Sequence, residues 1–342
     1  MDSVERTLAA LSGETYDRTP VVPLLIQHCL EVARIPHSVY STQPEKMAEA
    51  QILAAEQYGL DGFHISSDNY IVSEALGNRV SLPVDQPPQK AFACQAAKAD
   101  VSLLRKNPDP YTSARMPVMI EATRLARRAV GNRKFIKANC DSGPFTVASS
   151  LRGAEALFMD LYDREQYVLD LMDAASDAIV RYAAALAKAG AHAITYGEST
   201  GSLVSREQFE AYVLPANRRV VERIKAATGL PVFFHMCGKV DHIVDLMAKT
   251  GADCLELDSF TDLGAAYEKT GRSLCITGTV DTVSLLLEGS PQEVYEASLE
   301  CIRVSGGKRL ILSSGCETPR HTPPENIRAM VRAARDAAAG AI

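Results

Sequence analysis

Three residues with metal-ligating side chains follow two apolar stretches that lie far apart in the 342-residue chain. Residues 232–235 have the composition of a strand that ends in His235, with Cys237 two positions later, and residues 310–313 form a second such run ahead of Cys316. Because residues two apart on a strand point to one face, His235 and Cys237 can present an imidazole and a thiolate to the same ion. A further thiolate from Cys316 would complete a zinc site whose fourth position stays open, which is typical of catalytic zinc.

A structural interpretation of the same residues has to be weighed. Cysteine is among the most buried residue types, so any of the eight cysteines can be a small core residue instead of a ligand. Two features favour the metal: both cysteines follow strand ends, and Gly238 and Gly315 beside them permit a close approach of the backbone. We therefore predict that the fold brings His235, Cys237 and Cys316 together around one zinc ion.

Composition and charge narrow the class of protein. The chain is 46% hydrophobic and 23% charged, the balance of a globular protein, and it has no apolar run of about 18 residues that could span a bilayer. Without a secretion signal at its start, and with cysteines that lack framework spacing, it is expected in the cytoplasm with reduced thiols. A net charge of −6 without a basic cluster argues against nucleic acid as a partner.

The strands that must position the ligands recur along the whole sequence. Eight apolar runs rich in β-branched and aromatic residues alternate with helix-patterned segments, at 21–27, 62–67, 134–139, 192–196, 232–235, 254–257, 274–277 and 310–313. This rhythm predicts a single α/β domain over residues 1–342, a (β/α)8 TIM barrel with an N-terminal helical extension and a hairpin-bearing insertion near residues 77–100. A doubly wound sheet is the alternative, but no glycine-rich phosphate loop follows the first run.

In a barrel, function lies at the carboxyl ends of the strands, and the residues there are polar. Besides the metal ligands, the candidates in this position are Asp68, Asn69, Asn139, Asp141, Glu198 and Asp258. Such residues also cap helices, an interpretation that we favour for Thr279 and Asp281. Glu198 can reach the metal or a substrate proton from the neighbouring strand, or it can be a solvated loop acid. His64, inside a strand, is expected to be a satisfied core histidine.

Residues 6–23, RTLAALSGETYDRTPVVP, resemble the amino-terminal signature of the uroporphyrinogen decarboxylase superfamily, and the similarity continues to the last helix. The decarboxylases carry an arginine-bearing stretch after this signature, whereas residues 26–31 here read IQHCLE. His235, Cys237 and Cys316 match the ligand pattern of the superfamily's zinc-containing methyltransferases, which move a methyl group between a corrinoid protein and a small acceptor. The resemblance implies that these residues bind Zn²⁺ and that methylcobalamin arrives on a separate corrinoid protein.

The resemblance leaves two acceptors, tetrahydrofolate and the thiol coenzyme M. A pterin ring presents donor and acceptor edges that acids and amides can match, so we assign pterin binding to Asn139, Asp141, Glu198, Asp258, Asp68 and Asn69, with Glu198, Asp258 and Asp141 also catalytic. The sulfonate of coenzyme M requires a basic residue or a helix N-terminus. The expected activity is therefore transfer of a methyl group from a corrinoid protein to tetrahydrofolate in a bacterial demethylation pathway, with coenzyme M methylation as the alternative and a decarboxylating lyase as a third reading.

Overall fold

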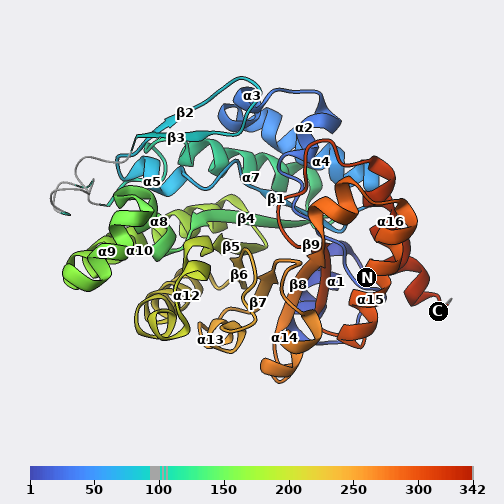
Figure 1. The fold of residues 1–342 in the computed structure, drawn as a ribbon. Coiled ribbons are helices and arrows are strands. Elements are labelled where there is room, and N and C mark those ends of the chain that lie inside the picture. The colour runs from blue at the N-terminus through green and yellow to red at the C-terminus, as the bar shows by residue number, and fades with distance from the viewer. Residues whose placement is uncertain (93–100, 102–103, 105–106, 341–342) are drawn as a thin grey trace.

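The computed structural model describes residues 1–92, 101, 104 and 107–340, and within them seven parallel strands curl into a barrel wall surrounded by helices (Figure 1). Neighbouring strands of this sheet are paired in the order β1-β4-β5-β6-β7-β8-β9. Their bounds are Gly62–Ile65 (β1), Phe135–Ser142 (β4), Ala193–Gly197 (β5), Val232–Met236 (β6), Cys254–Leu257 (β7), Cys275–Val280 (β8) and Leu310–Ser314 (β9). These bounds confirm the predicted barrel.

The predicted first strand is reduced to a single bridge. Val21 pairs with Leu312 of β9, the Val22 N–H donates to the Leu312 carbonyl at 2.9 Å, and the Asp61 N–H ahead of β1 donates to the Val21 carbonyl at 3.0 Å. The segment therefore occupies the eighth place in the wall, between β9 and β1. Pro20 and Pro23 flank it, and because proline has no N–H to give to a ladder, a longer strand cannot form there.

The helices pack on the outer face of the wall. The α-helices are Ser3–Ser12 (α1), His28–Ala33 (α2), His37–Thr42 (α3), Pro44–Tyr58 (α4), Ile71–Ala75 (α5), Met116–Val130 (α7), Pro144–Arg152 (α8), Ala154–Asp163 (α9), Glu165–Ala189 (α10), Arg206–Gln208 (α11), Leu214–Thr228 (α12), Val244–Ala248 (α13), Leu263–Lys269 (α14), Pro291–Ser305 (α15) and Pro324–Ala338 (α16). Shorter turns of other pitch are Ser199–Leu203 (η2), Phe209–Val213 (η3) and Thr282–Leu287 (η4). None of the helices among the described residues is long and apolar enough to cross a membrane.

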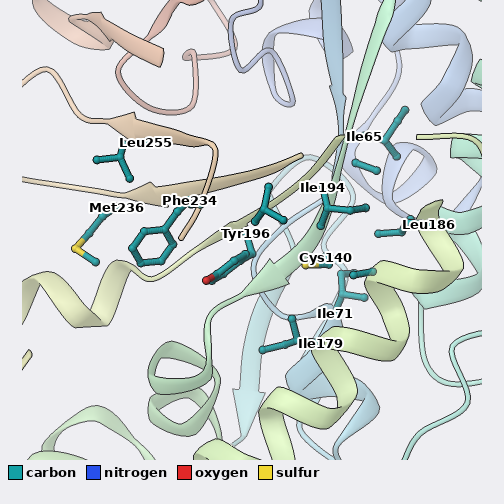
Figure 2. Packing of buried hydrophobic residues seen from close by; sticks show 14 of the residues in the cluster. Ile65, Ile71, Cys140, Ile179, Leu186, Ile194, Tyr196, Phe234, Met236 and Leu255 are labelled. Atoms are coloured by element: carbon teal, nitrogen blue, oxygen red, sulfur yellow. The ribbon is translucent and has the colours of Figure 1, made fainter. Parts of the chain in front are cut away.

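Alternate residues of each strand face the helices and the barrel interior. Ile194 and Tyr196 of β5 point outward and lie among side chains that include Ile179 and Leu186 of α10 (Figure 2). The intervening inward residues form a second core at the amino-terminal end of the barrel, made of Val22, Phe135, Ala193, Phe233, Cys254, Cys275 and Ile311 together with residues of α1. The opposite, carboxyl end of the barrel is left for the polar residues.

Two features lie outside the simple alternation. The predicted hairpin forms from β2 (Arg79–Ser81) and β3 (Gln89–Phe92), which pair antiparallel, while the rest of the predicted insertion, residues 93–100, falls outside the described residues. Helices α8 and α9 were not expected; Pro144 begins the first at a position where its missing N–H costs nothing, and Gly153 separates the two. Asp281 caps η4 as predicted, accepting from the backbone N–H groups of Val283 and Ser284.

Candidate metal centre

The structure brings the three predicted ligands together at the carboxyl end of the barrel. His235 Nε2 lies 3.0 Å from Cys237 Sγ and 3.9 Å from Cys316 Sγ, and the two sulfurs are 3.6 Å apart. In a tetrahedral zinc site, usual bond lengths place two sulfurs about 3.8 Å apart and a nitrogen about 3.6 Å from each sulfur. The spacing and the donor types therefore fit one Zn²⁺ with a fourth position free. It is the only group of three or more such ligands found among the described residues.

Close backbone packing fixes the two cysteines. Cys237 is followed by Gly238, whose φ of +83° suits glycine, and whose N–H donates to Asp258 Oδ2 at 2.8 Å. Cys316 is preceded by Gly315, where a Cβ atom would lie 2.5 Å from the backbone nitrogen of Ser259. Both glycines thus hold the ligand loops against the turn that follows β7, as their position beside the cysteines indicated.

The cluster favours a thiolate even without a cation. A hydrogen bond from the Cys316 thiol, aided by the nearby His235 imidazole, lowers the pKa of Cys237 to about 3. The same sharing of one proton raises the pKa of Cys316. Burial alone would lower the pKa of His235, but the Cys237 thiolate outweighs it and raises that pKa to about 9. A site that stabilises negative sulfur in this way is suited to a divalent metal ion.

A cavity of about 290 Å³ opens beside the cluster. Its walls combine apolar and polar side chains from the carboxyl ends of several strands and from the hairpin insertion, namely Leu24, Ile26, Gln27, His64, Ser67, Asp68, Asn69, Tyr70, Pro87, Pro88, Asn139, Thr195, Tyr196, Gly197, Ser199, His235, Cys237, Glu256, Cys316 and Glu317. Among the residues predicted to bind a pterin, Asp68, Asn69 and Asn139 are in this lining.

A buried ion pair crosses the barrel interior at the cavity. Lys137 of β4 donates from Nζ to Glu256 Oε1 of β7, and both side chains are 2% exposed. The other oxygen, Glu256 Oε2, accepts from Thr195 Oγ1 at 2.7 Å. Burial would raise the pKa of Glu256, but the attraction of Lys137 and the nearby histidines lowers it to about 2. Glu256 is therefore a fixed carboxylate in the lining of the cavity.

Two other carboxyl groups reach the cavity. Asp68 forms a bidentate ion pair with Arg115: Nη1 donates to Oδ2 at 2.5 Å and Nη2 donates to Oδ1 at 3.0 Å. Glu317, next to the ligand Cys316, accepts from the Gln27 N–H at 2.6 Å through Oε1, and its buried Oε2 has no hydrogen-bond partner. Burial without a counter-cation raises the pKa of Glu317 to about 8.

Glu198 is not placed in the cavity, contrary to the prediction that it reaches the metal or a substrate proton. It is fully buried and caps helix α8: its carboxylate accepts from the N–H groups of Phe145 at 3.1 Å and Thr146 at 2.7 Å. The Thr146 hydroxyl and Asn217 Nδ2 also donate to it, at 2.5 and 3.0 Å. Because both oxygens are taken by these donors, Glu198 has a structural role in positioning α8.

Asp141 and Asp258 also lie outside the cavity lining. Asp141 is 1% exposed and accepts from the Val72 N–H at 2.6 Å, which places it at the start of α5. Burial raises the pKa of Asp141 well above its usual range. Asp258 holds the Gly238 N–H and so positions the loop that carries Cys237. The predicted catalytic and pterin-binding roles of Glu198, Asp141 and Asp258 are therefore not supported by where their carboxylates point.

Several cavity residues were missed or misread from the sequence. His64, expected to be a satisfied core histidine, lines the cavity and has a buried Nδ1 atom without a hydrogen-bond partner. Glu256 and Lys137 sit inside strand runs, where a charged residue facing the barrel interior is an anomaly. An acid in the buried run CLEL at residues 254–257 was the signal that could have identified this pair, because a charge is almost never fully buried unpaired.

Comparison with known proteins agrees with this architecture. Residues 2–337 match the family model described as uroporphyrinogen decarboxylase (URO-D). The chain belongs to the uroporphyrinogen decarboxylase family. As the superfamily resemblance of residues 6–23 indicated, the family membership extends over almost the whole chain. The match says which fold family the protein belongs to and leaves open which of the family's chemistries it performs.

The chain is also similar to curated methyltransferases of Methanosarcina species. It is 27% identical to the Methylated-thiol--coenzyme M methyltransferase of Methanosarcina mazei, over 98% of this chain and 90% of the relative. It is 26% identical to the Methylcobamide:CoM methyltransferase MtbA of Methanosarcina acetivorans, over 97% of each chain. A solved structure, a methyltransferase from Methanosarcina mazei, superposes with a TM-score of 0.90 at 24% identity and covers 98% of this chain and 99% of its own, which confirms the fold.

Proposed function

We propose that the protein transfers a methyl group from a methylated corrinoid protein to a thiol. The observation that carries this proposal is the His235, Cys237 and Cys316 cluster, which has the donor set and spacing of a zinc site with one free position and opens into a cavity. When bound there, Zn²⁺ supplies a positive charge that lowers the pKa of a coordinated acceptor thiol, so that the thiol is a thiolate at neutral pH. The curated relatives named above carry thiol or coenzyme M methylation in their names.

The reaction balances without another reactant. The acceptor thiol loses its S–H proton, the sulfur lone pair forms the new S–C bond, and the electron pair of the Co–C bond stays with cobalt, which passes from Co(III) to Co(I). The protein's residues orient the acceptor: Thr195 and Glu256, which the buried Lys137 holds in place, form a rigid polar surface in the cavity lining. Reactants held in line at near-attack distance lose little further entropy in the transition state.

Tetrahydrofolate, the acceptor first expected, is less well supported. Of the six acid and amide residues assigned to the pterin, Glu198, Asp141 and Asp258 are committed to backbone groups of α8, α5 and the Cys237 loop. The amine of tetrahydrofolate that would accept the methyl group also has its own lone pair, so it gains less from a metal ion that activates sulfur. A decarboxylating lyase is supported less still, because no arginine or lysine is among the described residues of the cavity lining to hold carboxylates.

We propose a separate corrinoid protein as the methyl donor because a cobalamin is too large to enter the cavity. A cobalamin is much larger than the cavity of about 290 Å³ beside the ligands, so its ring must approach from outside. The open carboxyl end of the barrel is where such a partner would bring the methyl group.

An acceptor assay tests the proposal. The protein is loaded with zinc, given a methylated corrinoid protein or free methylcobalamin, and offered either a thiol or tetrahydrofolate, while the cobalt absorbance and the methylated product are followed. We expect methyl transfer to the thiol, faster from the corrinoid protein than from the free cofactor. Transfer to tetrahydrofolate alone, or no transfer to either acceptor, would refute the thiol reaction.

A further inference from the structure

Cys237 has a hydrogen-bond partner outside the ligand cluster. Its Sγ atom lies 3.4 Å from the hydroxyl oxygen of Ser199, the first residue of η2. Apart from His235 and Cys316, no other side chain among the described residues forms a hydrogen bond with this sulfur. A thiolate that binds a metal ion has no proton to give, so the Ser199 hydroxyl is the donor of this bond when the site is loaded.

The backbone holds Ser199 beside the ligands. The Glu198 N–H donates to the His235 carbonyl at 2.8 Å, which ties the start of the turn to strand β6. The Gly201 N–H donates to the Glu198 carbonyl at 3.0 Å, and a Cβ atom at Gly201 would lie only 2.9 Å from Glu198 Cγ. The Glu198 carboxylate is itself fixed by donors from α8 and α12. The packing that keeps Glu198 out of the cavity therefore positions Ser199.

Ser199 also faces the space from which an acceptor would reach the ligands. It is half-buried and belongs to the cavity lining, together with Cys237 and Cys316. Among the described residues, the Ser199 hydroxyl has Cys237 as its only hydrogen-bond partner, so no other protein acceptor competes for its proton. The bond therefore acts on the thiolate at the open side of the cluster.

Resting on the proposed function, we infer that Ser199 is a positioning residue of the methyl-transfer site. Its hydroxyl donates to the Cys237 thiolate, withdraws charge from that sulfur, and so favours binding of the acceptor sulfur at the free position of the metal site. Ser199 takes no part in the bonds that form and break, so the balance of the methyl-transfer step is unchanged.

The direction of the effect follows from charge. Two thiolates together offset the 2+ charge of a zinc ion, so little positive charge is left to attract a further sulfur. A hydroxyl that donates to one thiolate lowers the charge which that thiolate gives to the metal. Hydrogen bonds to metal ligands typically change metal affinity or activity by about 10- to 100-fold. Without this bond, Cys237 would donate more strongly and the acceptor sulfur would be held less tightly.

Cobalt(II) in place of zinc reports on the bond directly. It accepts tetrahedral sulfur and imidazole ligands and gives a sulfur-to-cobalt charge-transfer absorption, recorded per bound cobalt ion. In Ser199→Ala the lone pairs of Cys237 lose their donor and rise in energy, so the absorption should shift to longer wavelength. Ser199→Thr keeps a hydroxyl and should retain the wild-type absorption. An unchanged absorption in Ser199→Ala would overturn the inference.

Thr200→Val is the matched control. It removes the hydroxyl of the next residue in the same turn, which is not a hydrogen-bond partner of Cys237 among the described residues, and it keeps the shape of the side chain. This variant should retain the wild-type absorption. A shift as large as that of Ser199→Ala would show that packing of the turn sets the absorption, and would overturn the role of the Ser199 hydroxyl.

Thiol binding separates this inference from the proposed function. Titration of the cobalt-loaded protein with 2-mercaptoethanol, followed by the same absorption, needs no methyl donor. The Kd should rise by about tenfold in Ser199→Ala and stay at the wild-type value in Ser199→Thr and Thr200→Val. Equal Kd values in all four proteins would overturn the inference and leave the proposed function standing. Absence of methyl transfer to any thiol by the zinc-loaded wild type would overturn the proposed function, whatever the cobalt spectra show.

Discussion

At the residue scale, local strand geometry positions two ligands of the candidate zinc site, and the closure of the barrel positions the third. His235 and Cys237 share a face because they are two apart at the end of one strand, which local geometry alone ensures. Cys316 joins them only because β9 closes the barrel and Gly315 lets its backbone approach Ser259. The third ligand is therefore the residue on which the site depends most.

Cys316→Ser should reduce bound zinc from about one ion per chain to a small fraction, because a hydroxyl is a poor zinc ligand beside a thiolate and an imidazole. Metal content of the purified protein after dialysis measures this directly. Cys301→Ser is the control: Cys301 is buried near Thr279 and is not part of the cluster, so this variant should retain zinc. Full zinc retention in Cys316→Ser would exclude Cys316 as a ligand.

His64 makes a distinct prediction about pH. Burial and the adjacent Lys137 lower the pKa of His64 from 6.5 to about 3 in the folded protein. Between these two pH values the imidazole is protonated in the unfolded chain and neutral in the folded protein. Protonation of the unfolded chain therefore lowers the free energy of unfolding. The loss begins as the pH falls below about 6.5 and continues towards pH 3, at about 1.4 kcal/mol per pH unit. Between pH 6.5 and 5, the free energy of unfolding should fall by about 2 kcal/mol more in the wild type than in His64→Gln, measured by urea unfolding.

The exposed His321 supplies the control for this measurement. Its side chain is 77% exposed, so His321→Gln should leave the pH dependence of unfolding as it is in the wild type. If His64→Gln retains the full acid sensitivity, the proton that destabilises the fold binds elsewhere.

At the scale of the elements, the order of strands and helices could be predicted from the sequence, and the partners of individual side chains could not. The predicted run 254–257 corresponds to β7 residue for residue, because period and length are local properties. The site role predicted for Glu198 is not supported by its hydrogen bonds, because its four donors come from α8 and α12, and α8 itself was not expected. Which backbone N–H a buried acid meets depends on tertiary packing.

Glu198→Ala should destabilise the protein without removing zinc. The substitution leaves the N–H groups of Phe145 and Thr146 without their acceptor, and Asn217 Nδ2 keeps only the Val213 carbonyl, at a cost of roughly 3 kcal/mol or more. Urea unfolding measures the loss, and metal analysis of the folded fraction should still give about one zinc ion per chain. Loss of zinc at unchanged stability would instead restore Glu198 as a ligand.

At the scale of the whole molecule, an ion pair links non-adjacent strands across the interior of the barrel. Lys137 of β4 meets Glu256 of β7, with β5 and β6 between them in the wall, and Thr195 of β5 joins the pair. Below this layer the barrel is filled by apolar side chains from β4 to β9. The pair therefore marks the boundary between the packed base of the barrel and the cavity at its carboxyl end.

Lys137→Met should be strongly destabilising, by about 3–5 kcal/mol, because it leaves the Glu256 carboxylate buried without its cation. In the double variant Lys137→Met with Glu256→Gln no unpaired charge remains, so most of the loss should be recovered. Urea unfolding of the two variants gives the comparison. A double variant no more stable than the single one would mean that packing of the lysine side chain, and not its charge, supports the barrel.

The most direct test of the zinc site and its thiol acceptor is zinc K-edge X-ray absorption of the protein before and after addition of the thiol that it methylates. Before addition we predict two sulfur ligands and one imidazole, from Cys237, Cys316 and His235, with a light atom in the fourth position. After addition the number of sulfur ligands should rise to three. A sulfur number that stays at two when a thiol substrate is bound, or a metal without sulfur ligands, would contradict the account.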